Sequence, residues 1–156
     1  MITTQKLVKL FSNILTMLVF LTSNYVFALE LPSSARLVLS DSTGVKNISL
    51  EISAWDRETG ISRRDVRGGT TTKVFQIDGT LLTLDQLLNP IIEYLNDEQF
   101  SIELYCDTHV CGGFNFRKNL KVANPPFMLI NVANYSVVTA IKNSSAISLV
   151  ASKLGN

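Results

Sequence analysis

Residues 83–95 read Thr-Leu-Asp-Gln-Leu-Leu-Asn-Pro-Ile-Ile-Glu-Tyr-Leu, and they carry the clearest helix signal in the chain. Thr83 and Gln86 fit a capping box. In this motif the Thr83 hydroxyl accepts a hydrogen bond from the Gln86 backbone N–H, and the Gln86 side chain accepts one from the Thr83 backbone N–H. Apolar residues then recur at spacings of three and four, which gives the helix one apolar face. Pro90 either kinks this helix or begins a second one, with Asn89 as its N-cap. We therefore expect one or two helices within residues 83–97.

Strand-like patterns lie on both sides of this helix. Residues 47–55 alternate between apolar and polar side chains, which is the period of a half-buried strand. Further strands are expected at 36–39, 71–77, 100–105, within 127–141 and at 146–150. Turn formers at 41–44 are expected to end the first strand, 56–70 to form a loop or a ragged hairpin, and 112–126 to be irregular. Roughly six short strands around this helical region predict an α+β domain with a small, mainly antiparallel sheet.

The first 28 residues have the three parts of a secretory signal peptide. Lys6 and Lys9 form a positive beginning, residues 10–21 are apolar, and Ala28 ends a Val-Phe-Ala site that predicts cleavage before Leu29. An uncleaved anchor is the alternative, but a span needs about 20 largely apolar residues and polar side chains interrupt this one. We expect residues 29–156 to form one domain in the periplasm or cell envelope, with no stable membrane span after cleavage.

The charge of the mature chain argues against nucleic acid as a partner. Lys6 and Lys9 are the only charges in the leader, so 12 of the 14 basic residues remain against 13 acidic ones. Binding to phosphates needs clustered Lys and Arg in excess. Arg57, Arg63, Arg64 and Arg67 could grip an anionic glycan or headgroup, yet neighbouring acids favour an ordinary solvated loop.

Two cysteines, Cys106 and Cys111, are the only ones in the chain. In an oxidising compartment such a pair is interpreted first as a disulfide, here closing a short loop. A metal site is the alternative, because His109 lies between them and could supply a third ligand, but no other Cys or His exists. A redox pair lacks the C-x-x-C spacing. No nucleophile motif accompanies His109, so we expect no enzyme and no cofactor.

One stretch resembles a known family, and it reads Cys106-Asp107-Thr108-His109-Val110-Cys111-Gly112-Gly113-Phe114-Asn115-Phe116-Arg117. It is similar to the N-terminal module of OmpA-family envelope proteins from α-proteobacteria, where Cys-Asp-Thr…Cys-Gly-Gly-Phe-Asp-Phe-Arg is typical. The resemblance extends to 75–79 and 87–90, and more weakly to Pro126, Met128 and 146–152, so that it covers most of residues 60–152. Asn115 replaces the usual Asp. The chain stops at Asn156, where family members continue into an OmpA-like domain, so a truncated gene, a fragment and a stand-alone relative all fit.

The resemblance implies a role in the cell envelope, because the OmpA-like domain resembles known peptidoglycan-binding domains. We therefore expect a non-catalytic periplasmic module that acts by protein or envelope contacts, with an envelope or peptidoglycan-associated protein as partner. The alternative is a small periplasmic metal- or redox-handling protein that uses Cys106, His109 and Cys111. Phe114 and Phe116 are expected on one side of a strand, in the core.

Overall fold

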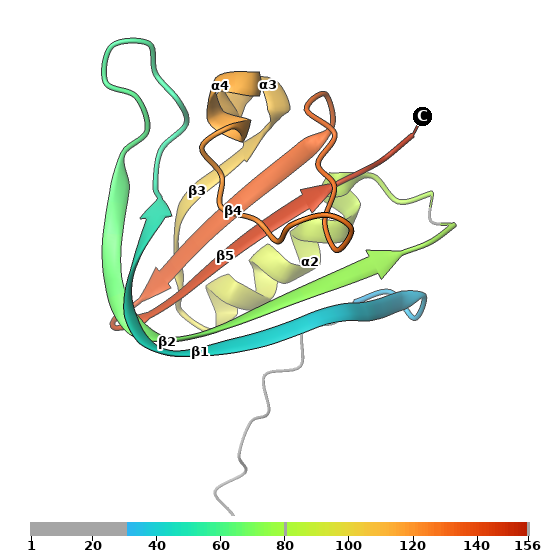
Figure 1. Cartoon of the computed structure of the whole chain (residues 1–156), viewed down its shortest axis with the longest axis horizontal. Coiled ribbons are helices and arrows are strands. Elements are labelled where there is room, and N and C mark those ends of the chain that lie inside the picture. The colour runs from blue at the N-terminus through green and yellow to red at the C-terminus, as the bar shows by residue number, and fades with distance from the viewer. Residues whose placement is uncertain (1–30, 80, 156) are drawn as a thin grey trace, which may run out of the picture.

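The computed structural model describes residues 31–79 and 81–155, so the predicted signal peptide lies outside the described residues. The elements follow the order β1 (Ala35–Glu51), β2 (Arg63–Ile77), α2 (Leu84–Asp97), β3 (Ser101–Asp107), α3 (Thr108–Cys111), α4 (Gly113–Arg117), β4 (Tyr135–Lys142) and β5 (Ser145–Ser152). β1 and β2 form one antiparallel ribbon, and β3, β4 and β5 form a second antiparallel sheet (Figure 1). The α+β prediction with mainly antiparallel strands is confirmed.

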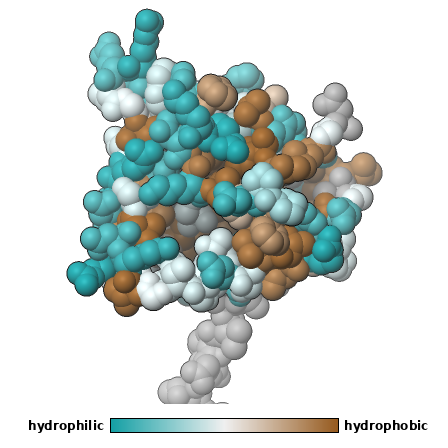
Figure 2. Space-filling view, in the orientation of Figure 1, coloured by the Kyte–Doolittle hydropathy of each residue, from teal (hydrophilic) through white to brown (hydrophobic). Residues whose placement is uncertain are grey.

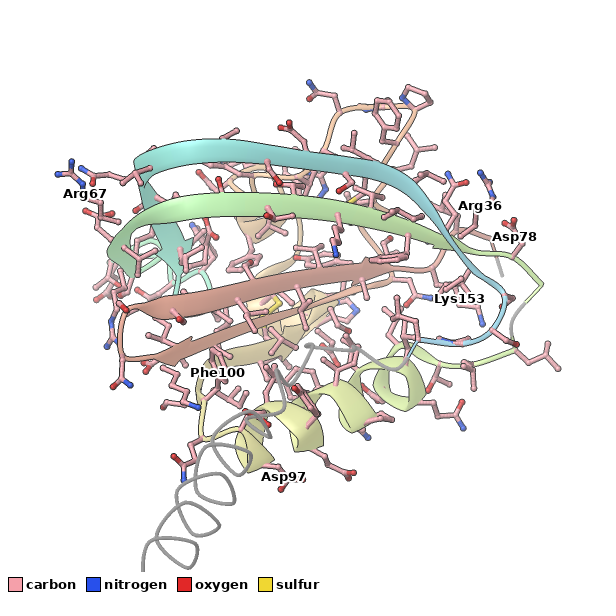
Figure 3. The ribbon with its side chains drawn as sticks, turned by 90° about the horizontal axis from the view of Figure 1, so that it is seen from below. Arg36, Arg67, Asp78, Asp97, Phe100 and Lys153 are labelled. Atoms are coloured by element: carbon pink, nitrogen blue, oxygen red, sulfur yellow. A yellow bond between two sulfur atoms is a disulfide. The ribbon has the colours of Figure 1, made fainter. Side chains whose placement is uncertain are left out.

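β4 is the centre of the molecule. It pairs with β3 on one edge and β5 on the other, and its residues 135–141 are all buried. A strand covered on both faces loses the alternation of a half-buried strand, which explains its nearly continuous run of β-formers. One face of this sheet meets α2, and the other meets α3, α4 and the loops that follow β1 and α4. Figure 3 shows α2 and the β1–β2 ribbon on opposite sides of the three-stranded sheet.

α2 has the predicted start and the predicted apolar face. The Thr83 hydroxyl accepts a hydrogen bond from the Gln86 backbone N–H at 3.2 Å, and the Gln86 side chain accepts from the Thr83 N–H at 3.0 Å. Leu88, Ile91 and Leu95 are buried against the sheet. Pro90 is exposed within one continuous helix. Of the two predicted alternatives, a single helix that contains Pro90 is confirmed, and a second helix beginning at Pro90 is wrong.

The β1–β2 ribbon differs from the prediction of short strands and a loop. Residues 41–44 do not end a strand, because they lie inside the 17-residue β1 and Asp41, Ser42 and Thr43 pair with residues 70–72 of β2. The register shifts between Thr43 and Lys46, and this irregularity accommodates Gly44 within the strand. Residues 63–70 likewise belong to β2 and not to a loop. The ribbon bends sharply at its middle (Figure 1).

Two later segments also differ from the prediction. Part of the expected irregular stretch 112–126 forms α4, and residues 127–134 of the expected strand are a turn-containing loop. The Asn131 side chain accepts a hydrogen bond from the Ala133 N–H at 3.0 Å, which bends the chain before β4 begins. Because residues 114 and 116 are helical, Phe116 is buried whereas Phe114 is exposed. The expectation that both lie on one side of a strand was wrong.

Within residues 31–79 and 81–155, no helix is both long enough and apolar enough to cross a membrane.

Candidate functional site

The family-like motif surrounds a disulfide between Cys106 and Cys111, as predicted. The two Cα atoms lie 5.1 Å apart, and both side chains belong to the core cluster on the face of the sheet opposite α2. Cys106 is the penultimate residue of β3 and Cys111 ends the single turn of α3, so the bond fastens the sheet to that turn. The Asp107 carboxylate caps α3 and accepts from the Val110 N–H at 3.5 Å. Because the sulfurs bond each other, they are not thiolate metal ligands or free thiols in this state.

Thr108 joins the motif to the start of β4. Its hydroxyl accepts a hydrogen bond from the Tyr135 backbone N–H at 3.1 Å and donates to the Tyr135 carbonyl at 3.2 Å. One buried side chain thus replaces the pair of backbone bonds that a neighbouring strand would supply. The Tyr135 hydroxyl donates to the Gly113 carbonyl at 2.8 Å, which closes the loop between α3 and α4 onto the sheet. Burial raises the pKa of Tyr135.

Gly112 is required by both backbone and packing. Its φ of +106° lies in a region that L side chains rarely adopt, and a Cβ there would lie 2.7 Å from the Trp55 Cβ. Trp55 also donates its backbone N–H to the Cys111 carbonyl at 2.8 Å. The loop between β1 and β2 is therefore bound directly to the motif. The sequence singled out Gly112 but not Trp55, whose partner lies more than fifty residues away.

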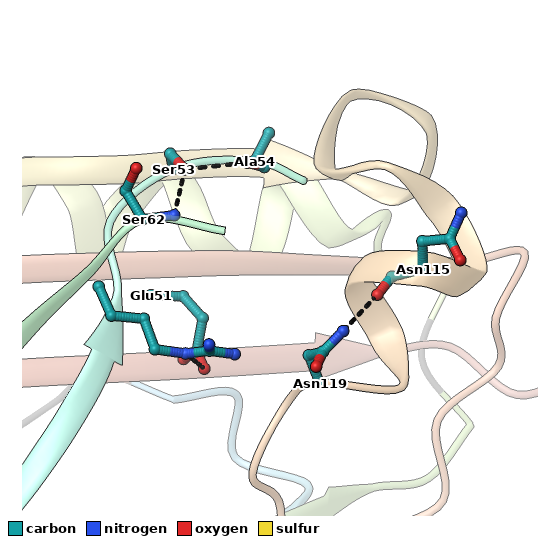
Figure 4. A network of polar contacts seen from close by, with 7 residues as sticks. Glu51, Ser53, Ala54, Ser62, Asn115 and Asn119 are labelled. Carbon is teal, nitrogen blue, oxygen red and sulfur yellow. Dashed lines mark hydrogen bonds and ion pairs between the residues drawn. The ribbon is translucent and has the colours of Figure 1, made fainter. Parts of the chain in front are cut away.

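The remaining motif residues lie on α4. The Asn115 carbonyl accepts from the Asn119 side chain at 2.8 Å, and its own side chain is not used in that bond (Figure 4). Arg117 is half-buried, and its Nε is shielded from solvent without a hydrogen-bond partner among the described residues. His109 is exposed on α3. No cluster of three or more His, Cys, Asp or Glu side chains that could hold a metal ion occurs within residues 31–79 and 81–155.

The arginines of the expected loop lie along the beginning of β2. Arg63 pairs with the buried Glu51 at 3.3 Å, and Arg64 pairs with Glu103 of β3 at 3.4 Å. Arg67 points away from the ribbon into solvent (Figure 3). The exposed Arg57 lies in the loop before β2. Arg63 therefore joins the two strands of the ribbon, and Arg64 joins the ribbon to β3.

Two hollows adjoin the motif. One, of about 400 Å³, is bordered by Asp85, Tyr105 and Asp107, and the Tyr105 hydroxyl donates to the Asp85 carboxylate at 2.7 Å. This bond raises the pKa of Tyr105 to about 12. The other, of about 510 Å³, lies between Arg117 and the segment 120–130. Most of its lining residues are aliphatic. The sequence of this segment has no regular period, so it does not predict the hollow.

Comparisons with known proteins give no relative for this chain. No protein-family model matches the sequence, and no curated protein or solved structure is significantly similar to it. The motif resemblance therefore stands on its residues alone.

Proposed function

We propose that this chain is an exported, non-catalytic domain of the bacterial cell envelope, and that it acts by contacts with other envelope components. The observation that carries the proposal is the Cys106–Cys111 disulfide, which lies in the core at the centre of the motif. Disulfides persist in oxidising compartments such as the periplasm and are rare in the cytosol. The leader pattern of residues 1–28 points to the same destination.

The use of the motif side chains supports a non-catalytic role. Thr108 bonds the backbone of β4, Asp107 caps α3, and Gly112 leaves room for Trp55. These interactions maintain the scaffold, and none of them activates a nucleophile or positions a base. The resemblance to the module of OmpA-family proteins favours the same interpretation, in which the motif builds a domain that is used for contact.

The β1–β2 ribbon is the surface we assign to such contacts. Its outer positions leave large apolar side chains in solvent, with Val45 70% exposed and Leu37 48% exposed. Its strands carry six basic side chains and three acidic ones, although the mature chain as a whole carries a small acidic excess. Exposed apolar groups among an excess of charge of one sign are typical of surfaces that meet another macromolecule.

Export is tested by the intact mass of the protein recovered from a bacterial periplasm, before and after reduction and thiol alkylation. We expect a chain that begins at Leu29, lacks two hydrogens relative to the dithiol, and takes up two alkyl groups only after reduction. A chain that retains residues 1–28 and alkylates without reduction would contradict the proposal.

Contact through the ribbon is tested by a photoreactive side chain placed at Val45 or, as a matched control, at the exposed Glu93 of α2. We expect discrete cross-linked products in the living envelope from position 45 and none from position 93. Equal products from both positions, or none from either, would refute the assignment of the ribbon as the contact surface.

A further inference from the structure

The hollow beside Arg117 combines two basic side chains with an aliphatic wall, part of which also packs against the core cluster. Its volume of about 510 Å³ falls within the range of small-molecule pockets, about 300–1,000 Å³. Leu120, Val122, Met128 and Ile130 are among the aliphatic side chains of its wall. The segment that forms this wall crosses in front of β4 and β5 (Figure 1), and the same face in Figure 2 shows apolar side chains gathered at the surface.

Arg117 is the motif residue that the fold leaves unused. Its Nε has lost water without gaining a protein acceptor, and no ion pair within residues 31–79 and 81–155 involves its guanidinium. An arginine donor shielded from water and left unpaired costs free energy. An anion at the remaining guanidinium nitrogens would not pair with Nε itself, but its attraction to the guanidinium charge would offset that cost. Among the other polar motif side chains, Asp107 and Thr108 have hydrogen-bond partners and His109 lies in solvent.

The charged residues of the wall indicate which charge a ligand must carry. Arg117 and Lys121 both border the hollow, and none of its bordering residues is acidic. A cationic ligand would therefore be repelled, and an uncharged apolar ligand would leave the guanidinium unpaired. A ligand with one anionic head and an apolar chain satisfies both parts of the wall.

We propose that this hollow binds an amphipathic monocarboxylate of the fatty-acid type. Two parallel N–H groups at one edge of a guanidinium match the two oxygens of a carboxylate. A phosphate brings a further oxygen and additional negative charge, for which the wall offers only the flexible Lys121. The chain of the ligand lies along the aliphatic wall, and its head lies at Arg117. The site does not depend on export, so its failure would leave the proposed envelope role untouched.

The test is a titration of the folded protein, with its disulfide intact, with sodium dodecanoate below the micelle concentration. Calorimetry measures affinity and stoichiometry, and backbone amide NMR shifts show where the ligand lies. We expect one saturable site, with the largest shifts within residues 117–130. Dodecyl phosphate is expected to bind more weakly, whereas acetate, dodecanol and dodecyltrimethylammonium are expected not to bind.

Matched variants separate the site from non-specific adsorption. Arg117→Met is expected to weaken dodecanoate binding by about tenfold to a hundredfold, the loss typical of hydrogen bonds to charged groups. Lys118→Met removes the same charge at the next, exposed position outside the wall and is expected to change affinity by less than about twofold. Leu129→Asp places a carboxylate on the wall at a side chain that is 54% exposed, so folding is retained while binding is lost.

Three outcomes would overturn the proposal. Equal weakening by Arg117→Met and Lys118→Met would mean that only net charge matters. Unchanged binding by Leu129→Asp would mean that the ligand lies elsewhere, even if the Arg117 variant does not fold. Equal affinity for dodecanoate and dodecyl phosphate would refute the choice of a carboxylate.

Discussion

Replacing Gly112 by alanine tests whether the motif and the loop after β1 are packed as one unit. The new Cβ would lie 2.7 Å from the Trp55 Cβ and 3.2 Å from the Trp55 carbonyl oxygen, both closer than normal contact. A side chain in a left-handed conformation costs about 1–2 kcal/mol. Overpacking a filled site costs typically about 1–3 kcal/mol more. Gly112→Ala should therefore lower the free energy of unfolding by about 2–5 kcal/mol.

Two other glycines with positive φ provide matched controls. Gly113 has φ +56°, and a Cβ there meets nothing closer than the Thr108 carbonyl at 4.0 Å. Gly60 has φ +74° and open space around it. Both alanine variants should therefore show only the backbone cost of about 1–2 kcal/mol.

The assay is urea unfolding followed by tryptophan fluorescence and by circular dichroism, with the disulfide intact. Trp55 is the only tryptophan, so fluorescence reports directly on the contact that the substitution disturbs. On heating, Gly112→Ala should melt on the order of 10 °C lower, given a few degrees per kcal/mol for a domain of this size. If Gly112→Ala is no less stable than Gly113→Ala, the packing of Trp55 on the motif is refuted.

Three further predictions concern the same region. Reducing the disulfide, whose cysteines are five positions apart, should lower the unfolding free energy by about 2 kcal/mol in urea titrations, because so short a loop restricts the unfolded chain little. Thr108→Val should cost about 2–4 kcal/mol by the same measurement, since it leaves the N–H and C=O of Tyr135 unpaired, whereas Thr108→Ser should cost much less. In an ultraviolet absorbance titration, Tyr105 should ionise with a pKa of about 12, and Asp85→Asn should lower that pKa. Because this pKa is raised above 10.0, the contribution of the Tyr105 bond to stability is complete below pH 10 and is lost as pH rises through about 12.

The sequence was most informative where a signal was local. Thr83 and Gln86 are three residues apart, and the apolar stripe of α2 repeats within one helix, so neighbouring residues determine both the start and the buried face. The disulfide was equally easy to predict, because the chain contains only one pair of cysteines. Both predictions needed no knowledge of distant contacts, and both are confirmed.

The β1–β2 ribbon was missed because its local signals favour turns. Residues Asp-Ser-Thr-Gly at 41–44 and the Gly68-Gly69 pair are residue types that usually end strands. In the fold, residues 41–43 pair with 70–72 of β2, and Gly68 pairs with Lys46. A register shift between Thr43 and Lys46 accommodates the extra chain, and hydroxyl pairs such as Ser42 with Thr71 connect the strands. Pairing between distant residues therefore outweighs the local preference.

The motif shows why residue identity alone does not reveal a site. Cys106, Thr108 and Gly112 are residue types that often belong to functional sites, yet here they have structural roles. Cys106 bonds the turn of α3, Thr108 bonds the start of β4, and Gly112 leaves room for Trp55. Arg117 looks like an ordinary surface cation at the end of the same stretch, yet within that stretch its buried Nε is the side-chain donor that has no partner in the described chain. The burial and partners of a side chain, which arise from contacts far along the chain, determine whether it serves the scaffold or a ligand. In this domain the distinctive part of the motif therefore accounts for stability, and its least distinctive residue is the one on which a binding function depends.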